Sequence, residues 1–173
     1  AECLVPWRLM KPLTDRYEFT ADTVADLSDQ FQASRPCVAS RFARLSSAPV
    51  AYAVAEEGII KYVIPSQALR EARIWIPSEV PLPRGSAAAA AIEQGCETLV
   101  EDLDGAVWST SDDASRFSVH EEVIHMEQWS QTLVLLSFEE EEPPAVSDRG
   151  AWSEDAELLP ELTGYLSWDK SGR

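Results

Sequence analysis

The segment SVHEEVIHMEQWSQTLVLLSF, Ser118–Phe138, decides the fold that we expect of this chain. Its content of valine, isoleucine and tryptophan favours strands over helices. We predict two long strands, Ser118–Trp129 and Thr132–Phe138, joined by a tight turn near Ser130 and Gln131. We expect both strands to belong to an antiparallel sheet.

The same segment holds the only two histidines of the chain, His120 and His125, with glutamates between them. A zinc peptidase places two histidines at i and i+4 on one helix, about 40° apart around its axis, and the glutamate between them activates the metal-bound water. Here the spacing is i, i+5, which separates the rings by about 140° on a helix and sends them to opposite faces of a strand. No Cys/His cluster offers a further ligand. We therefore expect no metal site and no catalytic residue in this motif.

The charged residues are distributed unevenly along the chain. The 173 residues include 30 acids and 14 bases, for a net charge of −16. Residues 1–50 carry six acids and six bases, whereas residues 101–150 carry 13 acids and two bases, a net of −11. Such a chain repels nucleic acid overall and favours basic partners. The asymmetry predicts two regions with different roles.

The sequence carries no sign of a membrane or export segment. No apolar run approaches the roughly 20 residues that span a bilayer, and no basic-then-apolar signal segment opens the chain, which starts with Ala. Cys3, Cys37 and Cys96 lie far apart, and their odd number argues against a disulfide framework. We expect a soluble cytoplasmic protein, cut from a longer one, that does not contact membranes.

A helix-turn-helix pair is predicted from Thr20 to Leu45. Apolar side chains recur at helical spacing in both halves, and Thr20 and Ser34 can cap the two helices. The second helix carries Arg35, Arg41 and Arg44 and no acid, as a recognition helix for phosphates and guanine edges requires. The first helix carries three aspartates. A packed helix pair with mixed surface charge is therefore the alternative to a contact with nucleic acid or a repressor.

Shorter elements are expected between this pair and the two long strands. Strands are predicted at residues 50–54, 59–64, 73–76, 96–100 and 105–108. The first two form a hairpin around Glu56-Glu57-Gly58, and DLDG at residues 102–105 is expected to be a turn. A short helix is predicted from the cap Ser86 to the terminating Gly95. After Phe138, glutamates and two prolines predict a charged, stiff linker to an acidic tail.

Three stretches, in this order, resemble the C-terminal part of ImmA/IrrE-type zinc metallopeptidases. AECLVPWRLM resembles the FAAELLMP helix that closes their peptidase domain, and ADLSDQFQASRPCVASRFARL is similar to the helical segment LAERFGVSxxAVxxRLxxL that follows it. PVAYAVAEEGIIKYVIPS with FSVHEEVIHMEQWSQTLVLLSF resembles the GAF-like domain of longer members, whose final strand often reads like TLxLL. The resemblance runs from Ala1 to about Phe138. It implies that the zinc-binding HExxH helix lies upstream, so that this chain holds neither zinc nor another cofactor.

The resemblance implies an α+β chain with three regions. Residues 1–47 would form a helical segment with a helix-turn-helix, residues 48–140 a GAF-like antiparallel sheet domain with a short helix, and residues 141–173 an acidic linker and tail. Such peptidases cut a helix-turn-helix repressor after a stress signal. This chain would be their regulatory and sensory region, not catalytic by itself.

A small-molecule signal and a basic protein partner are the ligands expected for such a region. A concave face of the sheet is a plausible pocket for the signal. Unless they form plain core, the residues expected to line it are Tyr52, Ile60, Tyr62, Trp75, Trp108 and Trp129. The acidic surface leads us to expect a basic partner such as the repressor. Two alternatives stay open: a DNA-binding transcription regulator with an acidic effector domain, and a protein-interaction module acting through its GYLSW tail.

Overall fold

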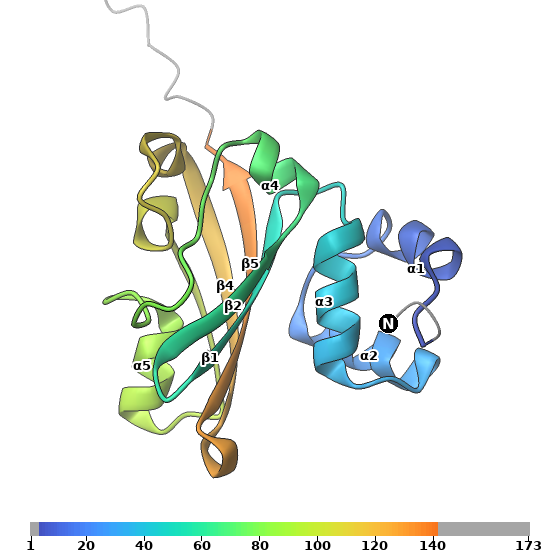
Figure 1. Ribbon diagram of the computed structural model, residues 1–173, viewed down its shortest axis with the longest axis horizontal. Coiled ribbons are helices and arrows are strands. Elements are labelled where there is room, and N and C mark those ends of the chain that lie inside the picture. The colour runs from blue at the N-terminus through green and yellow to red at the C-terminus, as the bar shows by residue number, and fades with distance from the viewer. Residues whose placement is uncertain (1–3, 142–173) are drawn as a thin grey trace, which may run out of the picture. The chain divides into compact units, whose positions relative to one another are not determined.

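The computed structural model describes residues 4–141, so the predictions for Cys3 and for the linker and tail after Glu141 lie outside the described residues. The chain is α+β, as predicted, with three helices followed by a sheet that two further helices interrupt (Figure 1). The helices are α1 Trp7–Thr14, α2 Ala21–Phe31, α3 Arg35–Leu45, α4 Gln67–Glu71 and α5 Ala87–Gln94. The strands are β1 Val50–Glu56, β2 Ile59–Pro65, β3 Thr98–Asp104, β4 Phe117–Met126 and β5 Gln131–Glu140. Within residues 4–141, no helix is long and apolar enough to cross a membrane.

The five strands form one antiparallel sheet in the order β2-β1-β5-β4-β3. The predicted pair of long strands is confirmed as β4 and β5, and the predicted hairpin is confirmed as β1 and β2. β4 ends earlier than predicted, at Met126, because Glu127–Trp129 form a 3₁₀ turn. Ser130 then adopts a left-handed conformation, with φ 48°, and reverses the chain into β5.

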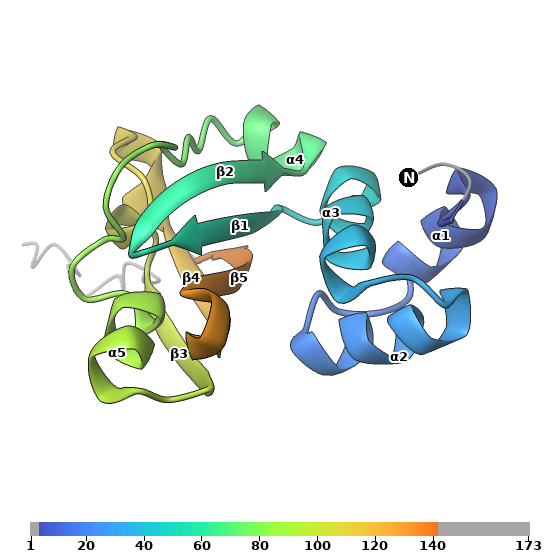
Figure 2. The same cartoon turned by 60° about the horizontal axis from the view of Figure 1, so that its bottom comes forward.

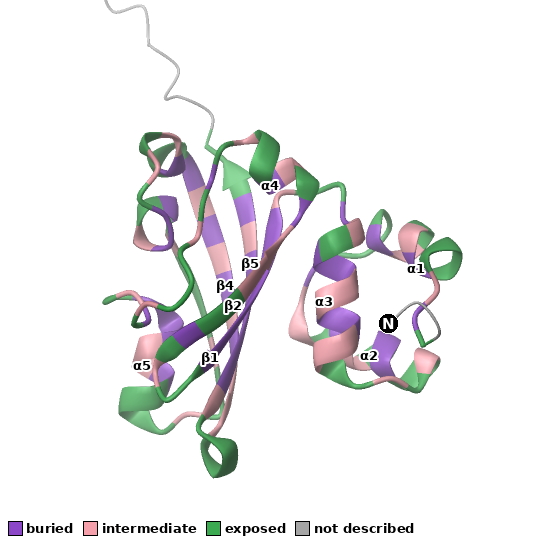
Figure 3. Cartoon of the chain, viewed as in Figure 1, coloured by how far each residue is buried: buried purple, intermediate pink, exposed green. Residues whose placement is uncertain are grey.

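Helices cover both faces of the central strands β1, β4 and β5, whose alternate residues point to opposite sides of the sheet. On one face, Val134 and Leu136 of β5 belong to the hydrophobic core that includes α5. On the other face, Leu133 and Leu135 pack with the buried side chains of α1, α2 and α3. Figure 2 shows α5 and the three N-terminal helices on opposite sides of the sheet, and Figure 3 shows the burial along β4 and β5. Two covered faces explain why β5 contains the continuous apolar run LVLL.

The predicted helix-turn-helix pair is confirmed as α2 and α3. Thr20 caps α2, because its Oγ1 accepts the backbone N–H of Thr23 at 3.2 Å. Ser34 occupies the corresponding position before α3, but its side chain makes no capping hydrogen bond. The rings of Phe19 and Phe42 stack with centroids 4.9 Å apart, which ties the start of α2 to the middle of α3.

Three local predictions are wrong. Residues 73–76 are not a strand: the chain forms α4 just before them, and the backbone N–H and C=O of Trp75 bond to the hydroxyl of Ser109 instead of to a neighbouring strand. Residues 105–108 contain a 3₁₀ turn, Gly105–Val107. The expected turn at residues 102–105 is in fact the end of β3, and Asp104 caps the 3₁₀ turn by accepting the N–H of Ala106 at 2.8 Å.

The two edge strands of the sheet differ in their surroundings. β2 is covered in part by residues 79–82: the N–H of Ile60 donates to the carbonyl of Val80 at 2.8 Å, and the N–H of Leu82 donates to that of Gly58 at 2.9 Å. β3 pairs only with β4 in the described part of the chain. Most side chains of β3 are exposed, and they include the acids Glu101, Asp102 and Asp104.

Candidate functional site

His120 of β4 lies between two carboxylates. Its Nδ1 is 2.7 Å from Oδ1 of Asp102 on β3, and its Nε2 is 3.4 Å from Oε1 of Glu122. Asp102 stands directly opposite His120 in the β3–β4 register, and Glu122 is two residues along the same strand. Both carboxylates therefore share one face of the sheet with the imidazole.

The surroundings of His120 favour its charged form. The hydrogen bond to Asp102 raises the pKa of His120, the charges of Asp102 and Glu122 raise it further, and partial burial opposes them. The side chain of His120 is 42% exposed, so solvent screens these interactions. The odd spacing places His125 on the opposite face of β4, as expected, where its Nδ1 lies 2.9 Å from the hydroxyl of Thr132.

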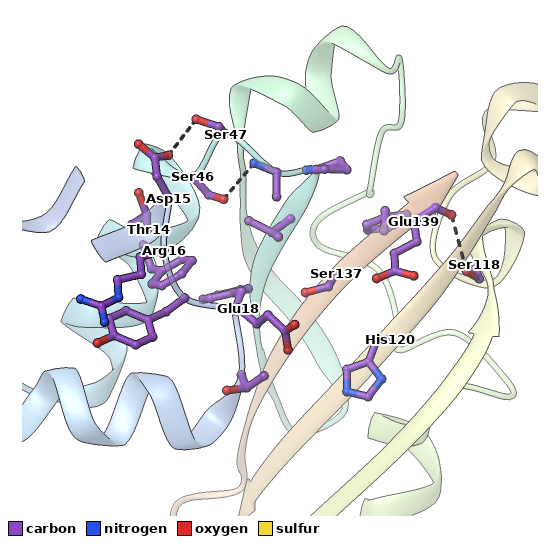
Figure 4. Close-up of a pocket in the computed structure, with 18 of the residues that line it drawn as sticks. Thr14, Asp15, Arg16, Glu18, Ser46, Ser47, Ser118, His120, Ser137 and Glu139 are labelled. Carbon is purple, nitrogen blue, oxygen red and sulfur yellow. Dashed lines mark hydrogen bonds between the residues drawn. The ribbon is translucent and has the colours of Figure 1, made fainter. Parts of the chain in front are cut away.

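A cleft of about 1080 Å³ opens beside His120 (Figure 4). Its walls come from the α1–α2 connection, residues 14–20, and from the α3–β1 connection, residues 46–50. Its third wall is the surface of the sheet. The residues that the sheet contributes are Asp102, Ser118, His120, Ser137, Phe138 and Glu139. The cleft therefore lies between the helical segment and the sheet.

Negative charge dominates the lining of this cleft. Its charged residues are Asp15, Glu18, Asp102 and Glu139, together with Arg16. Glu18, Asp102 and Glu139 are exposed. The guanidinium of Arg16 lies 5.4 Å from the centroid of the Tyr17 ring, within the range of a cation–π contact. Four acids outnumber Arg16 and His120, whose charged form Asp102 favours, so the lining keeps an excess of negative charge.

Asp15 is already engaged at the rim of the cleft. Its Oδ1 lies 2.6 Å from Nζ of Lys11 and accepts the hydroxyl of Ser47 at 3.0 Å. The hydrogen bonds from Lys11 and Ser47 lower the pKa of Asp15. Lys11 also donates to the Ser47 hydroxyl at 2.6 Å, so the three side chains form one cluster. Glu18, Asp102 and Glu139 are the exposed acids of the lining, and of these Asp102 is hydrogen-bonded to His120.

Glu121 points away from the cleft and is fully buried. Its carboxylate accepts the backbone N–H groups of Ala87 and Ala88, at 3.2 and 2.8 Å, and the indole N–H of Trp108, at 2.8 Å. Burial raises the pKa of Glu121, and the three hydrogen bonds partly offset this effect. The carboxylate thus satisfies two of the free N–H groups at the start of α5.

Glu122 also accepts a backbone N–H from the start of a helix, but on the opposite face of the sheet. Its Oε2 accepts the backbone N–H of Ala21, the first residue of α2, at 2.6 Å. Its other oxygen is the one that faces His120. Glu122 therefore links the imidazole beside the cleft to the start of the helix-turn-helix pair.

The structure does not bring the predicted pocket residues together. Trp108 is buried beside α5, whereas Tyr52 is buried on the helical face of the sheet, where Tyr62 stands edge-on to it with ring centroids 6.4 Å apart. Burial raises the pKa of Tyr52 strongly, and Tyr62 adds to the effect. Trp75 and Trp129 are 63% and 66% exposed. None of these five aromatic residues lines the cleft.

Ile60, the remaining residue proposed for the pocket, is fully buried in the core that includes α5. Its position agrees with the alternative that these apolar residues are core.

The three arginines of α3 occupy different environments. Arg35 and Arg44 are exposed at the two ends of the helix, and Arg41 is partly buried between them. Arg44 lines a separate groove together with Arg70 of α4. Arg44 is thus the arginine of α3 that shares a groove with a second arginine.

The residues that organise the site were not predicted from the sequence. Asp102 was assigned to a turn, and Glu121 was considered only as part of a zinc motif. One signal was present for Glu121: it lies two residues from Val119 and from Val123, so strand alternation places it on their buried face. Within residues 4–141, no group of three His, Cys, Asp or Glu side chains is arranged to hold a metal ion.

Comparison with known proteins assigns no family to this geometry. Neither protein-family models nor curated proteins match the chain. The acidic cleft and the side chains around it are therefore the basis for a functional proposal.

Proposed function

We propose that this chain is a regulatory binding module whose cleft takes a basic segment of a partner protein. The observation that carries the proposal is the charge of the cleft, where Glu18, Asp102 and Glu139 are exposed. Among residues 4–141, Arg16 is the only arginine or lysine in the lining. Clefts lined by one sign of charge attract ligands of the other sign and speed their association.

The shape and the lining of the cleft also suit a protein segment. Its volume of about 1080 Å³ lies slightly above the usual range of small-molecule pockets. Its lining also includes small exposed patches of apolar surface, from Tyr17 and Ala48. Lysine and arginine bury their methylene stems on such apolar surface while the charged ends reach nearby carboxylates.

In the scheme implied by the resemblance to ImmA/IrrE-type metallopeptidases, the partner is a helix-turn-helix repressor. The module would then recognise the basic DNA-binding surface of that repressor, or sense a signal, beside a zinc peptidase domain outside this chain. Zinc and proteolysis would belong to that domain, so we assign no catalytic residue here. The cleft supports the binding part of this scheme through charge alone.

A peptide titration tests the proposal. The probes are a fluorescein-labelled Arg-Lys hexapeptide and a Glu hexapeptide of the same length. The cleft variant combines Glu18→Gln, Asp102→Asn and Glu139→Gln. The matched control combines Asp26→Asn, Asp29→Asn and Glu93→Gln, three exposed acids outside the cleft. Both variants remove three carboxylates.

We expect the basic peptide to bind the wild type and the acidic peptide not to bind. Screened ion pairs contribute about 0.2–1 kcal/mol each, so the cleft variant should lose roughly three- to 100-fold in affinity. The control variant should lose clearly less. Equal losses in both variants would show that net charge, and not the cleft, attracts the peptide. Equal affinity for arginine amide and for the peptide would indicate a small cation as the ligand.

Duplex DNA is the alternative ligand, and the exposure of Arg35 and Arg44 on α3 favours it. In that case binding would fall steeply with salt and would be lost in the double variant Arg41→Ala, Arg44→Ala. A gel-shift titration that stays flat at low salt would exclude this alternative.

A further inference from the structure

Two adjoining grooves lie near the acidic cleft, and the larger one is lined by positive charge. Ser46 and Ser47 line both the acidic cleft and a groove of about 400 Å³, whose charged residues are Lys11, Arg44 and Glu71. An adjoining groove of about 530 Å³ shares Arg44 with it and is formed by the end of α3, the end of β2 and α4.

Two arginines dominate the larger groove. Arg44 lies in the last turn of α3 and Arg70 in the last turn of α4, and both are exposed. Among the described residues, neither guanidinium has an ion-pair or hydrogen-bond partner, and no acid lines this groove. In a chain with a net charge of −16, two unpaired arginines that face the same groove stand out from their surroundings.

We propose that this groove binds a phosphorylated small molecule through Arg44 and Arg70. Arginine presents a planar fork of N–H donors that matches the oxygens of a carboxylate or a phosphate. A carboxylate offers two oxygens and one negative charge, which a single arginine can satisfy. A phosphate monoester offers three acceptor oxygens and close to two negative charges, so it can engage both guanidinium groups.

The remaining walls of the groove suit the organic part of such a ligand. Val63, Ile64 and Pro65 provide apolar surface, and Gln67 provides an amide whose Nε2 donates to Glu71 at 2.7 Å. The volume of about 530 Å³ lies within the range of small-molecule sites. Lys11 is not counted as a ligand, because its ammonium group already contacts Asp15 and Ser47.

Calorimetric titration of residues 1–173 with inorganic pyrophosphate and with adenosine monophosphate tests the proposal. The variants are Arg44→Gln and Arg70→Gln, together with Arg44→Lys, which keeps the charge and removes the fork. The matched control is Arg35→Gln, since Arg35 is an exposed arginine of the same helix that does not line the groove. Thermal melting of each variant verifies that it is folded.

We expect both phosphate probes to bind the wild type at low salt. Loss of one charge-assisted hydrogen bond corresponds to roughly a tenfold or larger loss of affinity, which Arg44→Gln and Arg70→Gln should each show. Arg44→Lys should fall between Arg44→Gln and the wild type, and Arg35→Gln should stay within about twofold of the wild type. This site is independent of the acidic cleft, so either proposal can fail without the other.

Three results would overturn the proposal. The first is an absence of heat with either probe at low salt. The second is an equal loss in Arg35→Gln and Arg44→Gln, which would indicate non-specific attraction. The third is tighter binding of a short DNA duplex than of adenosine monophosphate, with the same dependence on Arg44, which would assign the groove to a nucleic-acid backbone.

Discussion

Glu121 and Glu122 are neighbours in β4, and each accepts a hydrogen bond from the first turn of a different helix on opposite sides of the sheet. Glu121 holds Ala87 and Ala88 of α5, and Glu122 holds Ala21 of α2. Strand alternation makes this possible, since adjacent side chains point to opposite faces. One dipeptide in the middle of the chain therefore orients both helical layers.

Substitution of Glu121 should destabilise the fold. In Glu121→Gln, the amide NH₂ replaces one acceptor oxygen, so at least one buried N–H donor from α5 or Trp108 loses its partner. We expect a loss of about 1–3 kcal/mol in the free energy of unfolding, measured by urea denaturation. Trp108→Phe, which removes the indole donor, should cost a similar amount.

Glu101→Gln is the matched control for Glu121→Gln, because Glu101 is the exposed cross-strand partner of Glu121. Its effect should stay within about 0.5 kcal/mol. A Glu121→Gln variant as stable as Glu101→Gln would show that the carboxylate does not hold α5.

The contribution of Glu121 to stability should depend on pH with a definite sign. Burial raises the pKa of Glu121 in the folded chain above 4.5, so the folded state binds the proton more tightly than the unfolded state. The resulting stability is complete below pH 4.5 and is lost as pH rises through the raised pKa. The difference in free energy of unfolding between the wild type and Glu121→Gln should therefore be largest near pH 4 and should become smaller at higher pH. A free-energy difference that grows as pH rises from 4 would contradict the raised pKa of Glu121.

His120 should titrate above its ordinary pKa of 6.5. Asp102 accepts a hydrogen bond from Nδ1–H of His120, and the charges of Asp102 and Glu122 favour the imidazolium cation. The contribution of His120 to stability is complete below pH 6.5 and is lost as pH rises through the raised pKa. NMR titration of the imidazole signals measures this pKa directly. Asp102→Asn should lower it, whereas Asp112→Asn, at an exposed acid outside the cleft, should leave it unchanged.

Protonation of His120 also adds a positive charge to the cleft. If the cleft binds basic segments, affinity for the Arg-Lys peptide should fall as pH is lowered through the raised pKa of His120. The variant His120→Asn should show a weaker dependence on pH over the same interval. An identical pH profile in wild type and variant would separate His120 from ligand binding.

Gly105 should not tolerate a side chain. A Cβ at this position would lie 2.3 Å from the carbonyl oxygen of Ala114 and 2.9 Å from that of Phe117. Both obstacles are backbone atoms, so Gly105→Ala must displace the 3₁₀ turn that carries buried Trp108 toward Glu121. We expect Gly105→Ala to lose about 1–3 kcal/mol or more in thermal or urea unfolding.

Gly95→Ala gives the comparison for Gly105→Ala. Gly95 ends α5 with φ 65° and has open space around its Cα. The cost there is limited to the left-handed backbone, about 1 kcal/mol. Equal costs at the two positions would indicate that the turn at Gly105 can move freely.

The sequence allowed the regular elements to be predicted, because their signals are local. The alternation and turn of β1 and β2, the caps of α2 and α5, and the apolar content of β5 each lie within a few residues. The segments containing Ile74 and Trp108 were predicted as strands because they are apolar. Both side chains are buried, but neither segment pairs with a neighbouring strand. The backbone next to Ile74 bonds to the hydroxyl of Ser109, and the backbone before Trp108 forms a 3₁₀ turn.

The site could not be predicted in the same way, because it depends on pairing between distant segments. Asp102 reaches His120 only through the β3–β4 register, and the cleft forms only where the connections around Asp15 and Ser47 meet the sheet. A single sequence contains no local signal for either contact. The grouping of Arg44 with Arg70 likewise depends on the position of α4, a helix that was not predicted from the sequence.

The acids of the edge strand β3 should keep two molecules from associating through this strand at neutral pH, but not at low pH. An uncovered strand edge is a template for pairing with a second molecule, and like charges along it prevent that approach. Glu101, Asp102 and Asp104 supply such charges on β3, whose outer edge pairs with no strand of residues 4–141. Acidification that neutralises these carboxylates removes the repulsion, so self-association through β3 should begin in acid, before the sheet itself unfolds.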